Sequence, residues 1–535
     1  MQKPLKILQA SAGSGKTFSL AAHYLILLFS ADNRYREILA VTFTNKATGE
    51  MRSGIQEVFK GLAQGDESKK IHAYRQLILV QHTHFDKDSL RLKADTIYRR
   101  ILHDYSRFSV STIDGFVQKV IRGFAFELGL DSSYALEMNI TKVKDALAEK
   151  MDQELDHNPE LLQWIIELAM ERIGENKSWN YRTELLELAG EIFKERFQTF
   201  EEAILLLNPD ELKALFESYI LLTKEKIRSF EDVMQASAQK ALDLFTASDI
   251  APADLKGKSR SPLFKLYKLV DLDFEKPEGL FALVDDEEGW FQKNKENPGL
   301  YSALNPLLRE IRGFFEDNYA EYVLATEVNK NIFYLRLMQK MVALLRDYRD
   351  ESSNLLISDA QKMLNGITRD VGGNPSFIWG KMGNRYRHFL FDEFQDTSAN
   401  QWNSFKSLLI NAMASPNEHL TDHLIVGDAK QSIYRWRNGD WNILHAQAKA
   451  DVGNELVLEE SLAQNYRSAA NIIDFNNKLY EVLPKRLQGI LNASLPEGAN
   501  AWWEAKGFNE VISNIYSKAS QNTHAGTQPD GVIRI

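Results

Sequence analysis

The chain has 535 residues, of which 44% are apolar and 26% are charged, a composition typical of globular proteins with large buried cores. It contains no cysteine, which excludes disulfides and thiolate-held metal clusters. No apolar run approaches the roughly 20 residues of a membrane-spanning helix, and a predicted strand follows the first residues directly, which leaves no room for a signal peptide. We therefore expect a cytoplasmic protein with about two to four domains and no membrane partner.

The formal net charge of −10 on its own argues against a polyanionic partner such as a nucleic acid. The charge is unevenly spread, however, because residues 131–384 carry about −14, which leaves about +4 for the two flanking segments together. Since the flanking segments hold every motif described below, their neutral-to-basic balance permits contact with phosphates.

The first motif is a glycine-rich turn between an apolar run and a helical pattern that extends from Lys16 to about Phe29. Gly13 and Gly15 allow the backbone to turn so that successive N–H groups point at phosphate oxygens, and the new helix adds its positive dipole end. Lys16 supplies a cation for the outer phosphates, and the Thr17 hydroxyl suits Mg²⁺. The alternative is a chance Gly/Ser turn. The predicted phosphate-binding stretch is Gln9, Ala10, Ser11, Ala12, Gly13, Ser14, Gly15, Lys16 and Thr17, with Ala10 where the strict pattern has glycine.

Two further predicted strands end in polar residues. Residues 37–43 form an apolar run that leads into Thr44 and Asn45, and residues 108–113 lead through Thr112 into another helix. Ligands of open α/β sheets bind at the carboxyl ends of parallel strands, which makes these residues candidates for ligand contact. A plain strand-to-helix loop is the alternative.

Residues 131–384 differ in character, because helical patterns and acidic side chains dominate and no repeat of fixed period is present. We interpret this stretch as a mainly α-helical insertion with a solvated acidic surface. The clearest helical patterns cover residues 161–170, 183–197, 210–227 and 320–350.

The α/β pattern resumes at a predicted strand, residues 388–391, which leads into Asp392 and Glu393. Adjacent carboxylates after an apolar strand are the natural partner of a phosphate loop. Asp392 can hold Mg²⁺ through its water shell, and Glu393 can take a proton from an attacking water. Adjacent acids also occur by chance, so this motif gains its weight from the upstream phosphate loop.

Two more predicted strands lead into candidate phosphate contacts. Gln431 follows residues 424–426, at a position where an amide can sense a terminal phosphate or orient water. Arg467 follows residues 456–462 and is a candidate for reaching the terminal phosphate as its charge develops. The chain ends in a strand-like stretch, residues 531–535.

An aromatic and basic cluster follows Gln431. Tyr434, Trp436 and Arg437 interleave flat rings with a cation, which suits stacking on unpaired bases and holding their backbone. Packing of the rings in a core is the alternative.

These motifs occur in a recognisable order along the chain. They are Ala10-Ser-Ala-Gly-Ser-Gly-Lys-Thr, Ala40-Val-Thr-Phe-Thr-Asn-Lys-Ala, Asp392-Glu-Phe-Gln-Asp-Thr, Val426-Gly-Asp-Ala-Lys-Gln-Ser-Ile-Tyr-Arg-Trp-Arg and Asn465-Tyr-Arg-Ser. Together they resemble the motifs of UvrD/Rep-type superfamily 1 DNA helicases. The long insertion is similar to that of the RecB/AddA branch, the helicase–nuclease subunits of double-strand-break repair.

The resemblance implies a fold and an activity. The implied fold class is α/β, a RecA-like parallel sheet flanked by helices (a P-loop NTPase) with a large, mainly α-helical insertion. The implied activity is ATP- and Mg²⁺-dependent 3′→5′ translocation on DNA, with unwinding, in repair and recombination. The implied domains are residues 1–130 and 385–480 for the RecA-like motor domain, 131–384 for the arm-like insertion, and 481–535 for a linker and the start of a second motor domain.

The resemblance also implies roles for single residues and for partners. The residues with implied catalytic roles are Lys16, Glu393, Gln431 and Arg467, those implied to hold Mg²⁺ are Thr17 and Asp392, and Gln9 is placed near the adenine. The residues assigned to the DNA-facing surface are Thr44, Asn45, Thr112, Phe116, Tyr434, Trp436 and Arg437. The implied partners are single-stranded DNA, a DNA duplex junction and a nuclease or helicase subunit.

Two motifs of a second RecA-like domain in these relatives, one containing His…Lys-Gly-Leu-Glu and one containing Thr-Arg, do not follow Asn465 in this sequence. We therefore expect the front part of a larger helicase, which binds ATP and DNA but hydrolyses ATP slowly and does not unwind DNA by itself. The main alternative is a non-hydrolysing fragment of a helicase paralogue that binds DNA or a partner. A P-loop ATPase that acts as a protein switch is a further alternative, but it does not explain the aromatic cluster.

Overall fold

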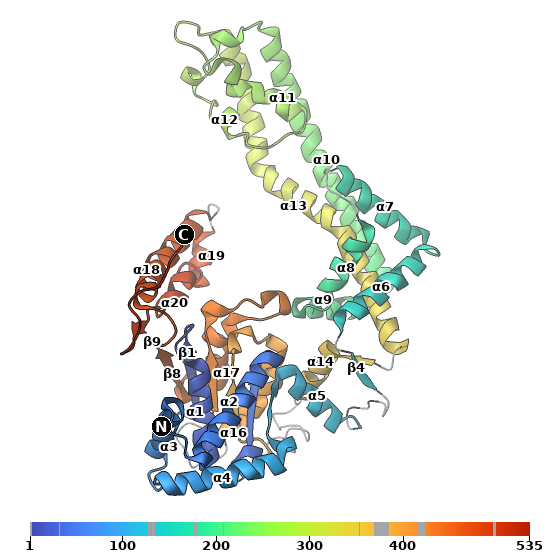
Figure 1. Cartoon of the computed structure of the whole chain (residues 1–535). Coiled ribbons are helices and arrows are strands. Elements are labelled where there is room, and N and C mark those ends of the chain that lie inside the picture. Colours follow the sequence, from blue (N-terminus) through green and yellow to red (C-terminus); the bar gives the residue numbers. More distant parts are fainter. Residues whose placement is uncertain are drawn as a thin grey trace. The chain divides into compact units, whose positions relative to one another are not determined.

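The computed structural model describes residues 3–31, 33–126, 128, 130, 134–137, 139–174, 180–206, 208–351, 354–368, 385–414, 423–495 and 499–534. The chain divides into two compact units, the first made of Met1–Ile140 with Glu351–Ile535 and the second of Thr141–Asp350 (Figure 1). The predicted domain boundaries at residues 130, 384 and 480 stay a prediction, and residue 384 lies outside the described residues.

The first unit is built on a six-stranded parallel sheet with the strand order β3-β2-β6-β7-β1-β8. Its strands are β1 (Leu5–Ala10), β2 (Ile38–Thr42), β3 (Val110–Thr112), β6 (His388–Phe391), β7 (His423–Gly427) and β8 (Val457–Leu462). In the middle of β1, Ile7 pairs with Ile425 on one side and with Glu459 on the other. Every residue of β2, β6 and β7 is buried, as expected for apolar parallel strands that are covered on both faces.

Helices cover both faces of this sheet, and each face has its own apolar core. The helices of one core are α1 (Lys16–Phe29), α2 (Asn45–Gln64), α3 (Lys69–Gln81) and α4 (Lys87–His103). Those of the other are α5 (Ile113–Gly123), α14 (Ile357–Thr368), α16 (Ala399–Ala414) and α17 (Ala448–Val452). The predicted α/β fold class, a parallel sheet flanked by helices, is confirmed.

The carboxyl ends of all six strands share one edge of the sheet, because the strands run in the same direction. The strands predicted from the apolar runs are confirmed, with ends that differ from the prediction by two residues at most. The polar stretches that the sequence singled out follow these strands directly. Parallel topology therefore brings stretches hundreds of residues apart in sequence to the same edge.

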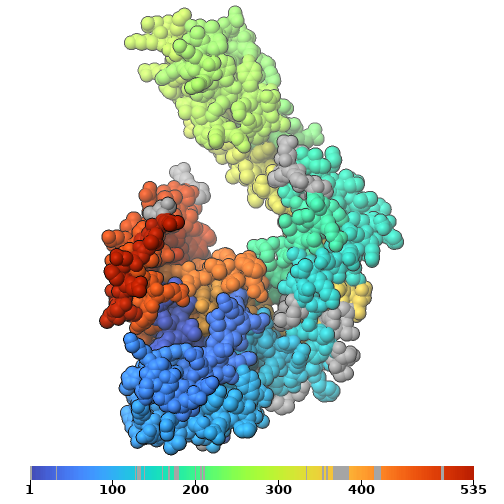
Figure 2. Space-filling model, viewed as in Figure 1, coloured from blue at the N-terminus to red at the C-terminus, as the bar shows by residue number. Residues whose placement is uncertain are grey.

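The last part of the first unit packs beside the sheet. It consists of β9 (Gln464–Asn465), α18 (Ala470–Ala493), α19 (Asn500–Ala505), α20 (Val511–Tyr516) and β10 (Asn522–Thr523), which pairs with β9. Figure 2 shows these C-terminal residues, in red, beside the first residues of the chain, in dark blue. The predicted strand at residues 531–535 is wrong for 531–534, which have no regular structure, and residue 535 lies outside the described residues.

The second unit is helical in its described residues, apart from an isolated bridge between Leu255 and Phe291. Its helices are α6 (Ile140–Leu155), α7 (Pro159–Gly174), α8 (Tyr181–Glu191), α9 (Glu195–Leu206), α10 (Pro209–Ala247), α11 (Lys265–Val270), α12 (Glu278–Phe281) and α13 (Pro298–Glu351). One of its apolar cores surrounds Trp290, whose indole Nε1 donates to the Leu283 carbonyl at 2.8 Å.

Some elements differ from the sequence prediction. The helix predicted at residues 183–197 is interrupted between α8 and α9, and the predictions at 210–227 and 320–350 cover only parts of α10 and α13. The short parallel pair β4 (Ala135–Glu137) and β5 (Asn354–Leu356) was not predicted, because three-residue strands leave no periodic pattern. Among the described helices, none is both long and apolar enough to cross a membrane.

Two histidines of the first unit have buried ring nitrogens: His23 on α1, which is partly buried, and His423, the fully buried first residue of β7. The Nε2 atom of each has no hydrogen-bond partner among the described residues. Burial and the nearby Lys6 charge lower the pKa of His23 from 6.5 to about 4. Burial and the neighbouring His23 lower the pKa of His423 to about 3. The folded unit therefore resists protonation at both sites.

We predict that acid destabilises the first unit through these histidines. Below the unfolded pKa of 6.5 the unfolded chain binds protons that the folded chain does not, so the free energy of unfolding is highest above 6.5 and falls as the pH drops toward 4. His423→Gln, which keeps an acceptor for the Phe389 N–H, should lose about 2 kcal/mol less than wild type between about pH 7 and about pH 5 in urea unfolding. His72→Gln, which replaces an exposed imidazole, is the control. An acid loss in His423→Gln as large as in the control would contradict this account.

Candidate functional site

The turn after β1 has the backbone geometry of a phosphate-binding loop. Gly13 and Gly15 have φ of 79° and 89°, in the left-handed region that favours glycine. The backbone N–H and the hydroxyl of Ser14 both donate to the Ser11 carbonyl, at 3.1 and 2.7 Å. Gly15 is the N-cap of α1 and offers no side-chain cap, so the first N–H groups of the helix can receive an external anion.

The stretch after β8 packs directly against this loop. The Tyr466 N–H donates to the Gly13 carbonyl at 2.9 Å. A Cβ at Gly13 would lie 2.8 Å from the Cβ of Arg467 and 3.0 Å from the Asn465 side-chain oxygen. Glycine is therefore required at position 13 by close approach as well as by its dihedral angle.

Lys16 connects the loop to two other strand ends. Its Nζ lies 2.9 Å from Oε2 of Glu393, which follows β6, and 2.9 Å from Oε1 of Gln431, which follows β7. The sequence predicted that these three residues act on one nucleotide, and the structure brings their side chains together. Their catalytic roles stay a prediction.

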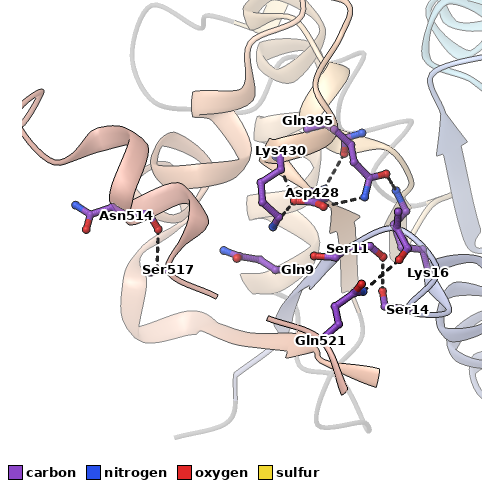
Figure 3. Close-up of polar contacts among 12 residues, drawn as sticks. Gln9, Ser11, Ser14, Lys16, Gln395, Asp428, Lys430, Asn514, Ser517 and Gln521 are labelled. Carbon is purple, nitrogen blue, oxygen red and sulfur yellow. Dashed lines mark hydrogen bonds and ion pairs between the residues drawn. The ribbon is translucent and has the colours of Figure 1, made fainter. Parts of the chain in front are cut away.

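A ring of hydrogen bonds closes behind Lys16, and Figure 3 shows several of its members at the end of the sheet. The Gln395 amide donates to Glu393 at 2.8 Å, and its oxygen accepts from the Asp428 N–H at 3.0 Å. The Gln431 amide donates to Asp428 at 2.8 Å, which completes the ring. Lys430 pairs with the same aspartate at 2.7 Å. Each carboxylate of the ring is thus held by at least two donors.

The two adjacent acids after β6 lie in an unusual local environment. Glu393 has φ of 48°, an uncommon conformation for a residue with a side chain, and its N–H donates to Asp392 Oδ1 at 3.0 Å. Burial raises the pKa of Asp392 from 3.8 to about 6, and the negative charge of Glu393 adds to the rise. The same two causes, in the same order, raise the pKa of Asp396 to about 6. Crowded, partly buried carboxylates of this kind favour a nearby cation.

The donors present fit a divalent cation that shares its coordination with phosphate. No cluster of three or more His, Asp or Glu side chains suits an all-protein metal site within the described ranges. Asp392 and the Thr17 hydroxyl are oxygen donors of the kind that Mg²⁺ prefers, and Mg²⁺ commonly takes one carboxylate plus substrate phosphates and waters. Thr17 and Asp392 thus have the donor atoms that Mg²⁺ requires, and their role in holding the ion stays a prediction.

The phosphate loop opens into a cavity of about 1100 Å³. Its lining residues come from the loop and α1, from α2 and α3, from the segments after β6 and β7, and from β8 and the stretch after it; they include Ala12 to Ser19, Glu393, Gln431, Tyr466 and Arg467. Arg467 therefore lines the cavity, and its contact with a terminal phosphate stays a prediction. Phe18 and Tyr466 add two exposed aromatic rings to the wall. A cavity of this size and polarity suits a nucleotide.

Three residues of the predicted stretch, Gln9, Ala10 and Ser11, do not line this cavity. Gln9 donates to Oε1 of Glu459 on β8 at 2.5 Å and is not part of the cavity lining. Ala10 is the buried last residue of β1. The placement of Gln9 near an adenine stays a prediction, and in this structure its amide is bound to a carboxylate.

Three residues assigned to the DNA-facing surface cap or begin helices. Thr44 is the N-cap of α2 and accepts from the Ala47 N–H at 3.1 Å, and the exposed Asn45 follows it. Thr112 is the N-cap of α5 and accepts from the Gly115 N–H at 3.0 Å. Their placement at the carboxyl ends of β2 and β3 agrees with a ligand-facing position, and DNA contact stays a prediction.

An exposed aromatic cluster follows Gln431. The ring of Tyr434 lies 4.9 Å from that of Phe43 and 6.0 Å from that of Trp436, which is 69% exposed. The guanidinium of Arg437 lies over both Phe43 and Trp436, at 5.3 and 5.7 Å from the ring centroids. Because Trp436 is open to solvent, core packing does not explain its ring.

The assignment of Phe116 to the DNA-facing surface is corrected by the structure, which places this residue in the core. Its side chain is 1% exposed. The ring lies 4.8 Å from Phe405 and 6.0 Å from Tyr386, between α5, α16 and the sheet. A ring packed in this way is unavailable for stacking on a base, and its helical spacing with Val117 and Val120 is a core pattern.

Sequence reasoning missed several residues of the site. Gln395, Asn465 and Tyr466 lie inside motifs that were recognised, but their side-chain partners depend on tertiary contacts. Gln521 lies outside every motif, yet its amide donates to the Ala12 carbonyl of the phosphate loop at 3.2 Å. No periodicity or spacing in the sequence indicates that contact.

Comparison with known proteins agrees with this geometry. The family model described as the UvrD/REP helicase N-terminal domain matches residues 1–451. The RecBCD enzyme subunit RecB of Chlamydia pneumoniae is 24% identical over 503 residues, which cover 88% of this chain and 42% of that protein. An ATP-dependent helicase/nuclease subunit of Latilactobacillus sakei is 24% identical over 539 residues, which cover 92% of this chain and 55% of that protein.

A second RecB protein, from Borreliella burgdorferi, is 24% identical over 544 residues, or 96% of this chain and 41% of that protein. The chain thus spans between 41 and 55% of the length of these three relatives. The similarity extends well beyond the phosphate loop, because it covers both units.

Proposed function

We propose that this chain, which belongs to the UvrD/REP helicase N-terminal domain family, binds ATP with Mg²⁺ and single-stranded DNA as the first motor domain of an ATP-dependent DNA helicase. The observation that carries the proposal is the Lys16 ammonium, which lies 2.9 Å from both Glu393 and Gln431 at the mouth of a phosphate loop. These are the groups that phosphoryl transfer requires at one point: a phosphate cation, a base and a polar amide near the attacking water.

The chain's own residues divide the work of hydrolysis. The loop N–H groups and Lys16 would hold the phosphates, and Thr17 with Asp392 would hold the cation, which would neutralise charge on the phosphate oxygens. In this structure Lys16 pairs with Glu393, so the carboxylate is occupied by a cation. When the phosphates attract Lys16 away, the Glu393 carboxylate becomes free to accept a proton from water.

The aromatic residues of the cavity favour a nucleotide over a simple phosphate. Phe18 and Tyr466 line the same cavity as the phosphate loop and expose their rings. Gly15 lies close to both residues, since a Cβ at this position would be 4.0 Å from the Cβ of Phe18 and 4.0 Å from the ring of Tyr466. A flat base can stack on such rings, which adds affinity beyond the phosphates.

The DNA part of the proposal rests on the Phe43, Tyr434, Trp436 and Arg437 cluster. Its rings and guanidinium offer stacking and cation–π contacts to unpaired bases and a positive charge to their backbone. Three members of the cluster, Tyr434, Trp436 and Arg437, belong to the same short segment as Gln431, so the proposed strand-binding surface and the nucleotide site share one stretch of backbone. That connection suits a translocase, in which DNA occupancy affects hydrolysis.

The wider role follows from the resemblance of the motifs. We propose 3′→5′ translocation, action in DNA repair and recombination at a duplex junction, and assembly with a nuclease or helicase subunit. The similar proteins include RecBCD enzyme subunits and an ATP-dependent helicase/nuclease subunit. Because translocation requires two domains that close on ATP, we propose that the RecA-like domain of this structure hydrolyses ATP slowly by itself and that unwinding requires a two-domain motor.

The alternative is a module that binds DNA or a partner without turnover. The observation that favours it is the double restraint of Glu393, which both Lys16 and Gln395 hold in this structure. Both donors bind the same oxygen, Oε2, and while they stay in place that oxygen is not available to an attacking water. The first experiment below separates the two functions.

We predict that Glu393→Gln abolishes most hydrolysis and preserves nucleotide binding. Loss of a general base costs about 10²–10⁴-fold in rate, whereas the amide still accepts a hydrogen bond from Lys16. The measurement is single-turnover hydrolysis of ATP with and without a single-stranded oligonucleotide, alongside the dissociation constant for Mg·ATP. Glu460→Gln, on β8 and paired with Lys6, is the matched control. If Glu393→Gln hydrolyses ATP at the same rate as the control, the proposed enzymatic function is contradicted and the binding module is favoured.

We predict that Trp436→Ala weakens binding of a single-stranded oligonucleotide. Stacking of one base on an aromatic ring contributes about 1–3 kcal/mol, so affinity should fall by about 5-fold to 160-fold. Fluorescence anisotropy at fixed salt measures the change. Trp502→Ala, which removes another exposed tryptophan from α19, is the control and should leave affinity unchanged. If wild type and Trp436→Ala bind the oligonucleotide with equal affinity, the proposal that this cluster binds DNA is contradicted.

A further inference from the structure

A C-terminal segment, residues 519–531, runs along the stretch that packs against the phosphate loop, and we refer to it as the strap. β10 in the strap pairs with β9, and the Asn522 N–H donates to the Ala463 carbonyl at 2.7 Å. Further along, the Ala470 N–H donates to the Gln528 carbonyl at 2.8 Å. The strap is therefore fixed on both sides of the residues that approach the nucleotide cavity.

One strap residue, Gln521, reaches the phosphate loop itself (Figure 3). Its amide donates to the Ala12 carbonyl at 3.2 Å, and its side-chain oxygen accepts from the Asn465 amide at 2.8 Å. The Asn465 amide also lies 3.4 Å from the same Ala12 carbonyl. Gln521 is in turn held through its main chain, which exchanges two hydrogen bonds with the Asn477 side chain of α18, at 2.8 and 2.9 Å.

The contact has a specific consequence for the loop. A phosphate loop works only when its N–H groups point at the anion, which requires the carbonyls between them to point elsewhere and to find other donors. Tyr466 satisfies the Gly13 carbonyl, and Gln521 and Asn465 satisfy the Ala12 carbonyl. Because the bond from Asn465 is long, Gln521 is the better donor to Ala12.

A second contact links the strap to the cavity wall. The His524 ring lies 5.1 Å from the ring of Tyr466, one of the two exposed rings of the cavity. His524 is fixed by a turn in which its N–H and its carbonyl both bond to the Thr527 hydroxyl, at 3.0 and 2.9 Å. The strap thus touches the loop at one residue and the aromatic wall at another.

We propose that Gln521 is a positioning residue of the nucleotide site, which holds the phosphate loop in its anion-binding conformation by fixing the Ala12 carbonyl. The ligand is the nucleoside triphosphate or diphosphate of the proposed function, on which this inference rests. Gln521 lies outside all the recognised motifs and more than five hundred residues from the loop in sequence. By linkage, a bound nucleotide should also stabilise the strap.

The test compares three variants of the 535-residue chain. Gln521→Met keeps the volume of the side chain and removes its donor and acceptor, and Gln521→Ala removes the side chain. Asn522→Ala is the matched control, because Asn522 holds its neighbours through main-chain bonds. The readouts are the dissociation constant for fluorescent Mg·ADP, hydrogen exchange of the loop peptide that contains residues 12–15, and urea unfolding.

We expect Gln521→Met and Gln521→Ala to weaken Mg·ADP binding by about threefold to tenfold, the effect of one hydrogen bond. In both Gln521 variants the loop amides should exchange faster than in wild type, while the urea midpoint stays that of wild type. Asn522→Ala should match wild type in all three measurements. If Gln521 served only to hold the C-terminal segment, exchange would rise in the strap alone and nucleotide affinity would be that of wild type. That result overturns the inference.

Wild type and Lys16→Ala separate this inference from the proposed function. If wild type binds no nucleotide, the proposed function fails before Gln521 is tested. If wild type binds Mg·ADP, Lys16→Ala does not, and the Gln521 variants bind like wild type with unchanged loop exchange, the inference about Gln521 alone fails.

Discussion

The site depends on one charge, the Lys16 ammonium, and on the three strand ends that hold it. Lys16 begins α1 after β1, Glu393 follows β6 and Gln431 follows β7, and the ammonium lies 2.9 Å from each of the other two. Only a parallel sheet with these strands side by side brings those residues to one point. In this structure the Glu393 carboxylate neutralises Lys16. Bound phosphates would replace Glu393 as the counter-charge of Lys16, so nucleotide binding would release Glu393 to act as a base.

The same edge of the sheet has a strained backbone and closely spaced negative charges, both of which lower the stability of the fold. Glu393 adopts a left-handed backbone conformation, and burial beside Glu393 raises the pKa of Asp392 to about 6. Such features are retained where function requires them. A cation between the phosphates and Asp392 would reduce the repulsion between Asp392 and Glu393. Binding of the nucleotide with its cation would therefore stabilise this edge of the sheet.

Much of the fold and of the site was predictable from sequence, because both depend on local patterns. Apolar runs indicated the six main strands, and the boundaries of α1 agree with the predicted helix. The assignment of Phe116 to the DNA-facing surface, which the family resemblance implied, was wrong. A helical phenylalanine after a strand gives the same local signal whether its ring faces solvent or, as here, the core. Gln395 and Gln521 were missed because glutamine has no periodic signature, and their partners are set by which strands and segments the fold brings together.

The most direct measurement is calorimetric titration of Mg·ADP into wild type, Lys16→Ala and Lys406→Ala. Lys406 pairs with Asp451 at 2.9 Å and serves as a matched cation from the same unit. The account predicts one-site binding to wild type and to Lys406→Ala, with binding lost or weakened by at least about tenfold in Lys16→Ala. Binding to Lys16→Ala as tight as to wild type would contradict the claim that this ammonium is where the strand ends meet the nucleotide.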